Sequence, residues 1–188
     1  MQCLNSFLGA SLLCFFFSLD LKEAENLWGT SCPHCQKGVL HWACWRRKIR
    51  CPGSIPVPPG FEIQFSLCCS AEGCRRRVTP RSIRFAGRSP NLAAVVILAK
   101  IFTCGPSSKR IAEVQELLEV DERTIRRWQA RWRCAEISSP WWQEIAGYFL
   151  LADQGIAALW ELYRQRFPSL AHALAKLTLS CRKLWPNW

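Results

Sequence analysis

The hydrophobic pattern of the chain changes near residue 89. Before it, residues 39–45 (VLHWACW) and 61–67 (FEIQFSL) alternate apolar and polar residues or are β-branched, which predicts two strands. Between them, CPGSIPVPPG at 51–60 is rich in Pro and Gly and predicts a loop. After residue 89 the apolar residues recur at helical spacing. We therefore expect an α+β fold that is mostly α, with a small β unit followed by helices.

Turn and capping residues place the expected helices. Ser89-Pro90 and Ser139-Pro140 each fit an N-cap followed by proline at the first helical position, and Gly105-Pro106 fits a stop between helices. The expected helices cover residues 90–103, 108–118, 122–134 and 140–150, with more helix to residue 184.

The helices at 108–118 and 122–134 form an amphipathic pair. Asp121 is a good N-cap for the second, because its side chain can accept from the free amide of Thr124. Glu119 stands in the turn, where glycine is common, so either it adopts a left-handed conformation or the turn differs. The apolar stripes of the two helices are formed by Ile111, Val114, Leu117 and Leu118, and by Ile125, Trp128 and Trp132.

The first 27 residues give the weakest pattern. Residues 6–19 are apolar like the core of a signal peptide, but no Lys or Arg precedes them and no small-x-small cleavage site follows. The run is shorter than the roughly 20 residues that span a bilayer. We expect either a helix packed on the body of the protein or an upstream extension, in a cytoplasmic, nucleoid-associated protein. A membrane-tethered regulator is the alternative.

The charge is strongly positive and concentrated. The 188 residues include 25 Lys and Arg against 14 Asp and Glu, a net charge of +11. Residues 75–134 carry 14 of these cations and five acidic residues, so one third of the chain holds a net charge of +9. Arginine dominates there, as expected where a planar group grips phosphate or a guanine edge. The expected partner is a polyanion, and double-stranded DNA is the first candidate.

Two of the cysteine pairs have the spacing of metal ligands. Cys32 and Cys35 form a C-x2-C pair, and Cys69 and Cys74 a C-x4-C pair 33 residues later. Two such turns on adjoining hairpins can place four thiolates around Zn²⁺, as in a zinc ribbon. Cys68 can replace Cys69 as a ligand. The C-x4-C spacing resembles the second knuckle of topoisomerase zinc ribbons, which favours Cys69.

The remaining cysteines have other roles. Cys44 and Cys51 form a third pair, open to a redox disulfide or alternative ligation. Cys104, Cys134 and Cys181 are isolated on expected helices, where a lone cysteine is usually a small core residue.

The second amphipathic helix has the residues of a DNA-recognition helix. In a helix-turn-helix, base edges are read from the N-terminal part of the second helix. The expected base readers are Glu122, Arg123 and Arg127. The alternative is an ordinary amphipathic hairpin with a cationic outer face. The expected phosphate contacts are Thr124, Arg126, Arg131 and Arg133, together with Arg75, Arg76 and Arg77 after the second cysteine pair.

Three motifs together resemble a known family. CPHC, CCSAEGCRRRVTPRSIRFAGR and LLEVDERTIRRWQARWR, within residues 32–134, are similar to bacterial proteins linked to insertion sequences and often labelled transposases. That family pairs a zinc ribbon with a helix-turn-helix. The resemblance supports zinc ligation by Cys32, Cys35, Cys69 and Cys74, and implies recognition of element ends or regulation of transposition.

Signatures of DNA-cutting chemistry are missing from the sequence. Asp occurs only at 20, 121 and 153, so the Asp-Asp-Glu trio that holds two metal ions is not available. There is no H-x-H motif and no phosphate-binding loop of the G-x4-G-K-S/T type. We expect a DNA-binding protein with no small-molecule substrate. The alternative is a degenerate or split transposase whose catalytic subunit is a separate chain.

The sequence thus predicts four segments. Residues 1–27 are the apolar N-terminal segment, 28–88 a zinc ribbon with a basic extension, and 89–136 the helix-turn-helix domain. Residues 137–188 are rich in Trp, Leu and Ala at helical spacing and either complete the core or form a homodimer interface. A dimer would present two recognition helices to half-sites about 34 Å apart.

Overall fold

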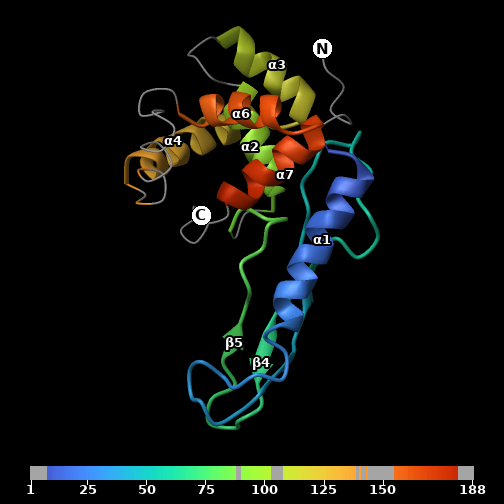
Figure 1. Cartoon of the computed structure of the whole chain (residues 1–188), viewed down its shortest axis with the longest axis vertical. Coiled ribbons are helices and arrows are strands. Elements are labelled where there is room, and N and C mark those ends of the chain that lie inside the picture. The colour runs from blue at the N-terminus through green and yellow to red at the C-terminus, as the bar shows by residue number, and fades with distance from the viewer. Residues whose placement is uncertain are drawn as a thin grey trace.

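The computed structural model describes residues 8–87, 90–102, 108–138 and 155–181, together with Pro140 and Gln143. These residues form an α+β structure, roughly half helical, with two small sheets. A helical body occupies one end of the elongated molecule and the strands occupy the other, with helix α1 (Ala10–Glu25) running between them (Figure 1). The expected fold class is therefore confirmed at this level.

The strands are short and antiparallel. A three-stranded sheet has the order β1 (Leu40–Trp42), β4 (Leu67–Cys69), β5 (Arg77–Val78), and β2 (Trp45–Arg46) pairs with β3 (Ile63–Gln64). Each of the two predicted strands is thus present but divided in two. We call residues 27–46 and 62–79, which carry these strands and the clustered cysteines, the cysteine module.

Helix α1 belongs to both ends of the molecule. Leu12, Leu13 and Phe16 are buried in the core of the helical body, whereas Ala24 is buried in the core of the cysteine module. The expectation that the N-terminal segment forms a helix packed on the protein is confirmed, and α1 joins the two cores. Within the described part of the chain, no helix is both long and apolar enough to cross a membrane.

The helical body is built around α2 (Ala93–Phe102), whose residues are buried except for its last-turn Lys100 and Phe102. α3 (Ser108–Leu118), α4 (Glu122–Ser138), α6 (Gly155–Arg166) and α7 (Leu170–Cys181) pack against α2. Buried side chains of α6 and α7 belong to the same core, including Ile156, Leu159 and Leu177. Of the two roles expected for residues 137–188, core or homodimer interface, this supports the core role for the described residues 155–181.

Three local predictions differ from the structure. α2 begins three residues after Pro90. The residues before it are held by other segments: the Pro90 carbonyl accepts from the Arg50 amide, and Asn91 and Leu92 form β-bridges with Arg50 and Phe85. α4 continues to Ser138, beyond the predicted end at residue 134. Cys181 is buried as expected, but Cys134 is exposed, so its predicted core role is wrong. Cys104, Ser89, Gly105-Pro106 and nearly all of the helix expected at 140–150 lie outside the described residues.

Candidate metal centre and nucleic-acid interface

Two tight turns present the four clustered cysteines. In the first, the Cys32 amide donates to the Gly38 carbonyl and the Gln36 amide donates to the Cys32 carbonyl, both at 2.8 Å. In the second, the amides of Cys74 and Arg75 donate to the Ala71 carbonyl. Gln36 and Arg75 close these turns with φ of 59° and 44°. Left-handed backbone at two non-glycine residues is consistent with turns held by their surroundings.

Gly38 is required where the two turns meet. A Cβ at this position would lie 2.5 Å from the Cys69 sulphur and 2.7 Å from the Ala71 amide nitrogen. These separations are shorter than real contacts of this kind, so a side chain would push the second turn away from the first. Glycine therefore permits the close approach that brings the two cysteine pairs together.

The four sulphurs of Cys32, Cys35, Cys69 and Cys74 all lie within 4.8 Å of one another. The Cys32 and Cys74 sulphurs are 3.9 Å apart, and those of Cys35 and Cys69 are 3.6 Å apart. Cys32 and Cys69 are buried, while Cys35 and Cys74 are half-buried. The cluster can hold a metal ion, as predicted from the cysteine spacing.

The strand register decides between Cys68 and Cys69. Side chains alternate between the two faces of a strand, so these neighbours point in opposite directions. Cys69 pairs with buried Leu40 on the core face, whereas Cys68 lies on the other face between His41 and Arg77. The Cys68 thiol donates to the Arg75 carbonyl at 3.3 Å. Cys69 is therefore the member of the cluster, and Cys68 is not.

The other cysteine pair is not a disulfide. Cys44 is an exposed free thiol on the cysteine module, and Cys51 is a half-buried free thiol. Burial and then the charge of Glu119 raise the pKa of Cys51, which keeps this thiol protonated near neutral pH.

Backbone amides prepare part of the cluster for negative charge. The amides of Gly38 and Lys37 donate to the Cys35 sulphur and lower the pKa of this thiol to about 6. Burial raises the pKa of Cys69 to about 12. Four adjacent thiolates repel one another, and a bound cation offsets this repulsion. The donor set therefore fits a metal ion that prefers sulphur ligands.

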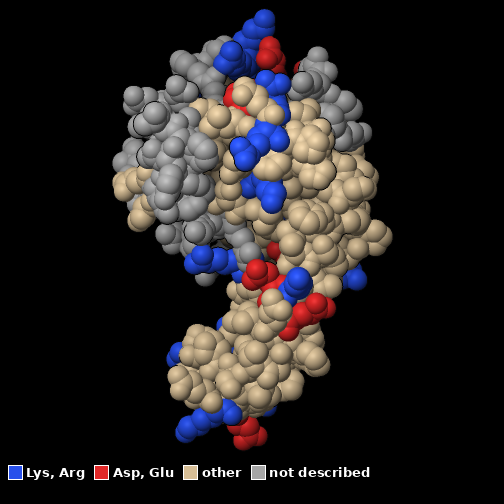
Figure 2. All heavy atoms as spheres, in the orientation of Figure 1, with Lys and Arg blue, Asp and Glu red and all other residues tan. Residues whose placement is uncertain are grey.

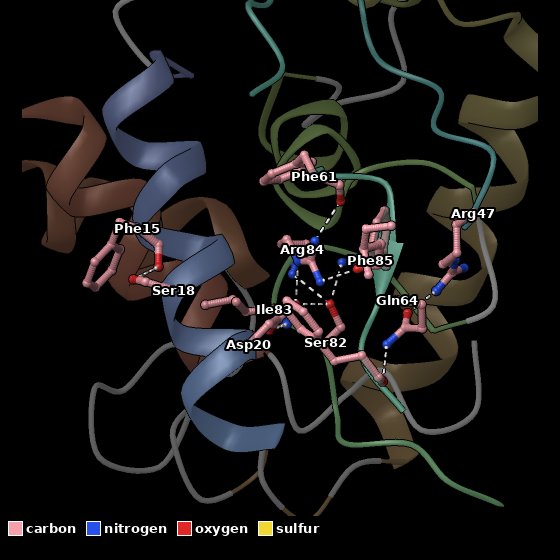
Figure 3. Close-up of polar contacts among 12 residues, drawn as sticks. Phe15, Ser18, Asp20, Arg47, Phe61, Gln64, Ser82, Ile83, Arg84 and Phe85 are labelled. Atoms are coloured by element: carbon pink, nitrogen blue, oxygen red, sulfur yellow. Dashed lines mark hydrogen bonds and ion pairs between the residues drawn. The ribbon is translucent and has the colours of Figure 1, made fainter. Parts of the chain in front are cut away.

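A buried ion pair joins α1 to the chain after β5 (Figure 3). The Arg84 Nε donates to the Asp20 carboxylate at 2.7 Å, and the two side chains are 0% and 5% exposed. The remaining guanidinium nitrogens donate to the carbonyls of Phe61 and Ile63 at 2.6 and 2.7 Å. Burial lowers the pKa of Arg84, and the Asp20 charge opposes this effect.

The Asp20 carboxylate is equally well satisfied. It accepts from the Ser82 hydroxyl and, at 2.7 Å, from the Ile83 amide. Four phenylalanine rings surround the Arg84 guanidinium with centroids 4.9 to 5.2 Å away, namely those of Phe17, Phe61, Phe65 and Phe85. Arg84 was counted in the basic segment 75–134, but the structure removes it from the surface available to a polyanion.

The turn between α3 and α4 matches the capping prediction. The Thr124 amide donates to the Asp121 carboxylate at 2.9 Å, which caps the N-terminus of α4. The hydrogen bonds from Thr124 lower the pKa of Asp121. Glu119 is left-handed, with φ of 51°, and its carboxylate accepts from the Gly53 amide at 2.9 Å. The glutamate thus ties the loop at residue 53 to this turn, a contact that glycine cannot make.

The arginines of α4 lie on its exposed face. Ile125, Trp128 and Trp132 are buried against the body, at most 2% exposed. Arg126 pairs with Glu122 at 2.5 Å across one helical turn, and the Arg127 Nη2 donates to the Thr124 hydroxyl at 3.0 Å. Six of the residues predicted to contact DNA are exposed on α4, namely Glu122, Arg123, Arg126, Arg127, Arg131 and Arg133.

Thr124 has a different place from the one predicted. Its side chain is buried, at 7% exposure, and its hydroxyl donates to Asp121 at 2.7 Å while accepting from Arg127. Both hydrogen-bonding roles of the hydroxyl are therefore used within the protein. Thr124 belongs to the cap of α4 and not to the surface that can meet phosphates.

Arg75, Arg76 and Arg77 are exposed, but they lie at the opposite end of the molecule from α4 (Figure 1). Figure 2 shows Lys and Arg side chains at both ends. The basic segment that is continuous in sequence is thus divided into two separate cationic surfaces by the fold.

The chain was compared with protein-family models, curated proteins and solved structures, and none of them matches. The resemblance of residues 32–134 to insertion-sequence proteins stays a prediction from motifs. The interpretation of both surfaces therefore depends on their own residues and geometry.

Proposed function

We propose that the chain is a sequence-specific DNA-binding protein of a mobile element, and that it acts in end recognition or in regulation of transposition. In this proposal α3 and α4 form a helix-turn-helix and α4 enters the major groove. The observation that carries the proposal is the exposed arginine face of α4, opposite a buried stripe of Ile125, Trp128 and Trp132.

The residue types on α4 fit the major groove. Arg123 and Arg127 lie in its N-terminal half, where base edges are read, and each bidentate contact to guanine gives about 1 to 3 kcal/mol of discrimination. Glu122 can accept from a cytosine amino group. Arg126, Arg131 and Arg133 are assigned to phosphates, which fix register and orientation.

The start of α4 is held in place before DNA arrives. Asp121 caps the helix, and Glu119 fixes the turn through its bond to the Gly53 amide. A fixed turn reduces the ordering cost of binding.

The metal in this proposal is zinc with a structural role. Four sulphurs at Zn–S distances of about 2.3 Å form a tetrahedron with edges of about 3.8 Å. The separations of 3.9 Å and 3.6 Å in the cluster are compatible with that tetrahedron. Four thiolates leave no coordination position for water or substrate, which is typical of structural and not catalytic zinc.

The mobile-element context comes from the motif resemblance alone. Because the sequence carries none of the DNA-cutting signatures considered, cutting is assigned to a separate catalytic subunit where the system has one. Homodimerisation is part of the proposal, because two copies of α4 would match a two-fold site with half-sites about 34 Å apart.

The test is selection of bound DNA from a random duplex pool with the zinc-loaded chain. The expected result is an enriched motif, with affinity for it that falls steeply as salt concentration rises. Arg164→Ala is a matched control, because Arg164 is an exposed arginine on α6 that pairs with Glu161 and lies outside α4. Absence of any enriched motif would contradict sequence-specific binding.

A further inference from the structure

The outer face of the three-stranded sheet carries exposed aromatic and cationic side chains. The register places His41, Cys68 and Arg77 in one row across β1, β4 and β5, on the face opposite buried Leu40 and Cys69. His41 and Arg77 are exposed and Cys68 is half-buried between them. This face is distinct from the metal cluster, whose Cys69 points inward.

An indole extends this row. The Arg77 guanidinium lies 4.9 Å from the centre of the Trp45 ring, and Trp45 is 38% exposed. Stacking on the ring orients the planar guanidinium, so less side-chain entropy is lost when it binds a ligand. We call His41, Trp45 and Arg77 the stacking face.

The charge around the stacking face favours an anionic ligand. The cysteine module carries five Lys and Arg, at positions 37, 46, 75, 76 and 77, against two Glu at 62 and 72. One of the two glutamates, Glu62, pairs with Arg46, whose Nε lies 3.9 Å from its carboxylate. Arg75, Arg76 and Arg77 follow one another and are all exposed. A ligand that brings both negative charge and flat apolar rings matches this surface.

We propose that the stacking face binds single-stranded DNA by stacking unpaired bases on Trp45, His41 and the Arg77 guanidinium, with phosphates held by Arg75 and Arg76. Aromatic side chains beside a cationic track are the usual means of holding single strands. In a duplex the base faces are covered by their neighbours, so a flat aromatic surface has nothing to stack on. This site goes beyond the duplex contact proposed for α4.

The fold places the two surfaces far apart. The 16 residues of α1 span about 24 Å and run from the cysteine module to the helical body (Figure 1). The chain therefore holds duplex DNA at one end and an unpaired stretch at the other. DNA with a junction between duplex and single strand would engage both.

The experiment measures the affinity of the full zinc-loaded chain for a fluorescent oligothymidylate of about 16 nucleotides, the upper range of single-strand sites. Trp45→Ala is expected to weaken binding at least 5-fold, and Trp45→Phe, which keeps a ring, less than 2-fold. Arg77→Ala is expected to weaken binding at least 5-fold. Trp28→Ala is the matched control, because Trp28 is 56% exposed but lies outside the strands, and it is expected to change nothing.

Several results would overturn the proposal. One is unchanged affinity in both Trp45→Ala and Arg77→Ala; another is an equal loss in Trp28→Ala. A tenfold preference for oligouridylate RNA would reassign the face to RNA. Zinc content and circular dichroism identify any variant that fails to fold. In that case the conservative variants decide the matter. If bases stack on this face, Trp45→Phe binds oligothymidylate well, because it keeps a ring, and Arg77→Lys binds it poorly, because an ammonium group does not stack. Arg127→Ala separates this site from α4, because it is expected to leave oligothymidylate binding intact.

Discussion

The cysteine module and the helical body are stabilised in different ways. Among the described residues, the core of the module consists of six buried side chains, two of which are cysteines of the cluster. The helical body instead surrounds a nearly fully buried α2 with side chains from four other helices. A core as small as that of the module rarely folds without metal or cross-links, whereas the body has a core of ordinary kind. From this comparison we expect only the module to depend on a bound metal for its fold.

The two ends meet at the Asp20–Arg84 pair. Asp20 is in α1, and Arg84 bonds the carbonyls of Phe61 and Ile63 on the chain entering the module. Because both side chains are buried, loss of either charge would leave the other buried without its counter-ion. The pair therefore connects α1 to the chain segments that enter and leave the module.

The largest expected effect is on the module alone. Cys32→Ser removes one of four ligands and is expected to reduce zinc from one per chain to none. The fold of the module is expected to be lost with the zinc, because at such sites a binding free energy of about 10 kcal/mol or more contributes directly to folding. Hydrogen exchange should become fast at Leu40 and Cys69, whose amides bond within the module, and stay slow in α2. Cys44→Ser, at an exposed thiol outside the cluster, should leave both measurements unchanged. Equal zinc in the Cys32 variant and the wild type would refute the metal centre.

The next effect concerns the junction. Arg84→Met leaves the Asp20 charge buried without its counter-ion, and the free energy of unfolding is expected to fall by about 3 to 5 kcal/mol. Arg164→Met removes a cation from an exposed pair and should cost at most about 1 kcal/mol. Denaturant unfolding measures both. Equal costs would mean that the buried pair does not join the two ends as described.

A smaller effect is expected on the exposed arginine face of α4 that we propose to bind DNA. Arg131→Ala should weaken duplex binding about equally for all sequences and reduce the slope of log affinity against log salt by about 1, as for loss of one phosphate contact. Titrations at several salt concentrations measure the slope. A change in base preference, or an equal change in Arg164→Ala, would contradict the assignment of Arg131.

The smallest effect separates two contributions at Glu119. Both Glu119→Ala and Glu119→Gly lose the bond to the Gly53 amide, but only glycine relieves the left-handed backbone. The glycine variant should be the more stable of the two by about 1 kcal/mol. Thermal or denaturant unfolding gives the order, and a more stable alanine variant would show that the backbone here is not strained.

Local features of the fold were predictable because they depend on neighbouring residues. The Asp121 cap follows from a side chain that reaches an amide three positions on. The cysteine cluster follows from spacing, since few roles other than metal binding need two such pairs. The two predicted strands are interrupted at residues 43–44 and 65–66. These interruptions were not predictable, because the alternating pattern of the sequence continues across both of them.

Long-range pairing was not predictable in the same way. Arg84 is one of the cations in the basic segment 75–134, and its burial is not expected, because a charged side chain is rarely fully buried without a partner. Its partner Asp20 lies 64 residues earlier, and no local pattern connects the two. The one signal available was an acidic residue directly after the apolar N-terminal run at residues 6–19. Thr124 was misplaced for a related reason, since its hydroxyl is taken up by Asp121 and Arg127 on either side.

The central claim is that the exposed arginine face of α4 reads DNA sequence. The most direct test is to repeat the selection from a random duplex pool with Arg127→Ala beside the wild type. The account predicts that one position of the enriched motif loses its guanine preference while the remaining positions are kept. An unchanged motif in both Arg127→Ala and Arg123→Ala would contradict it.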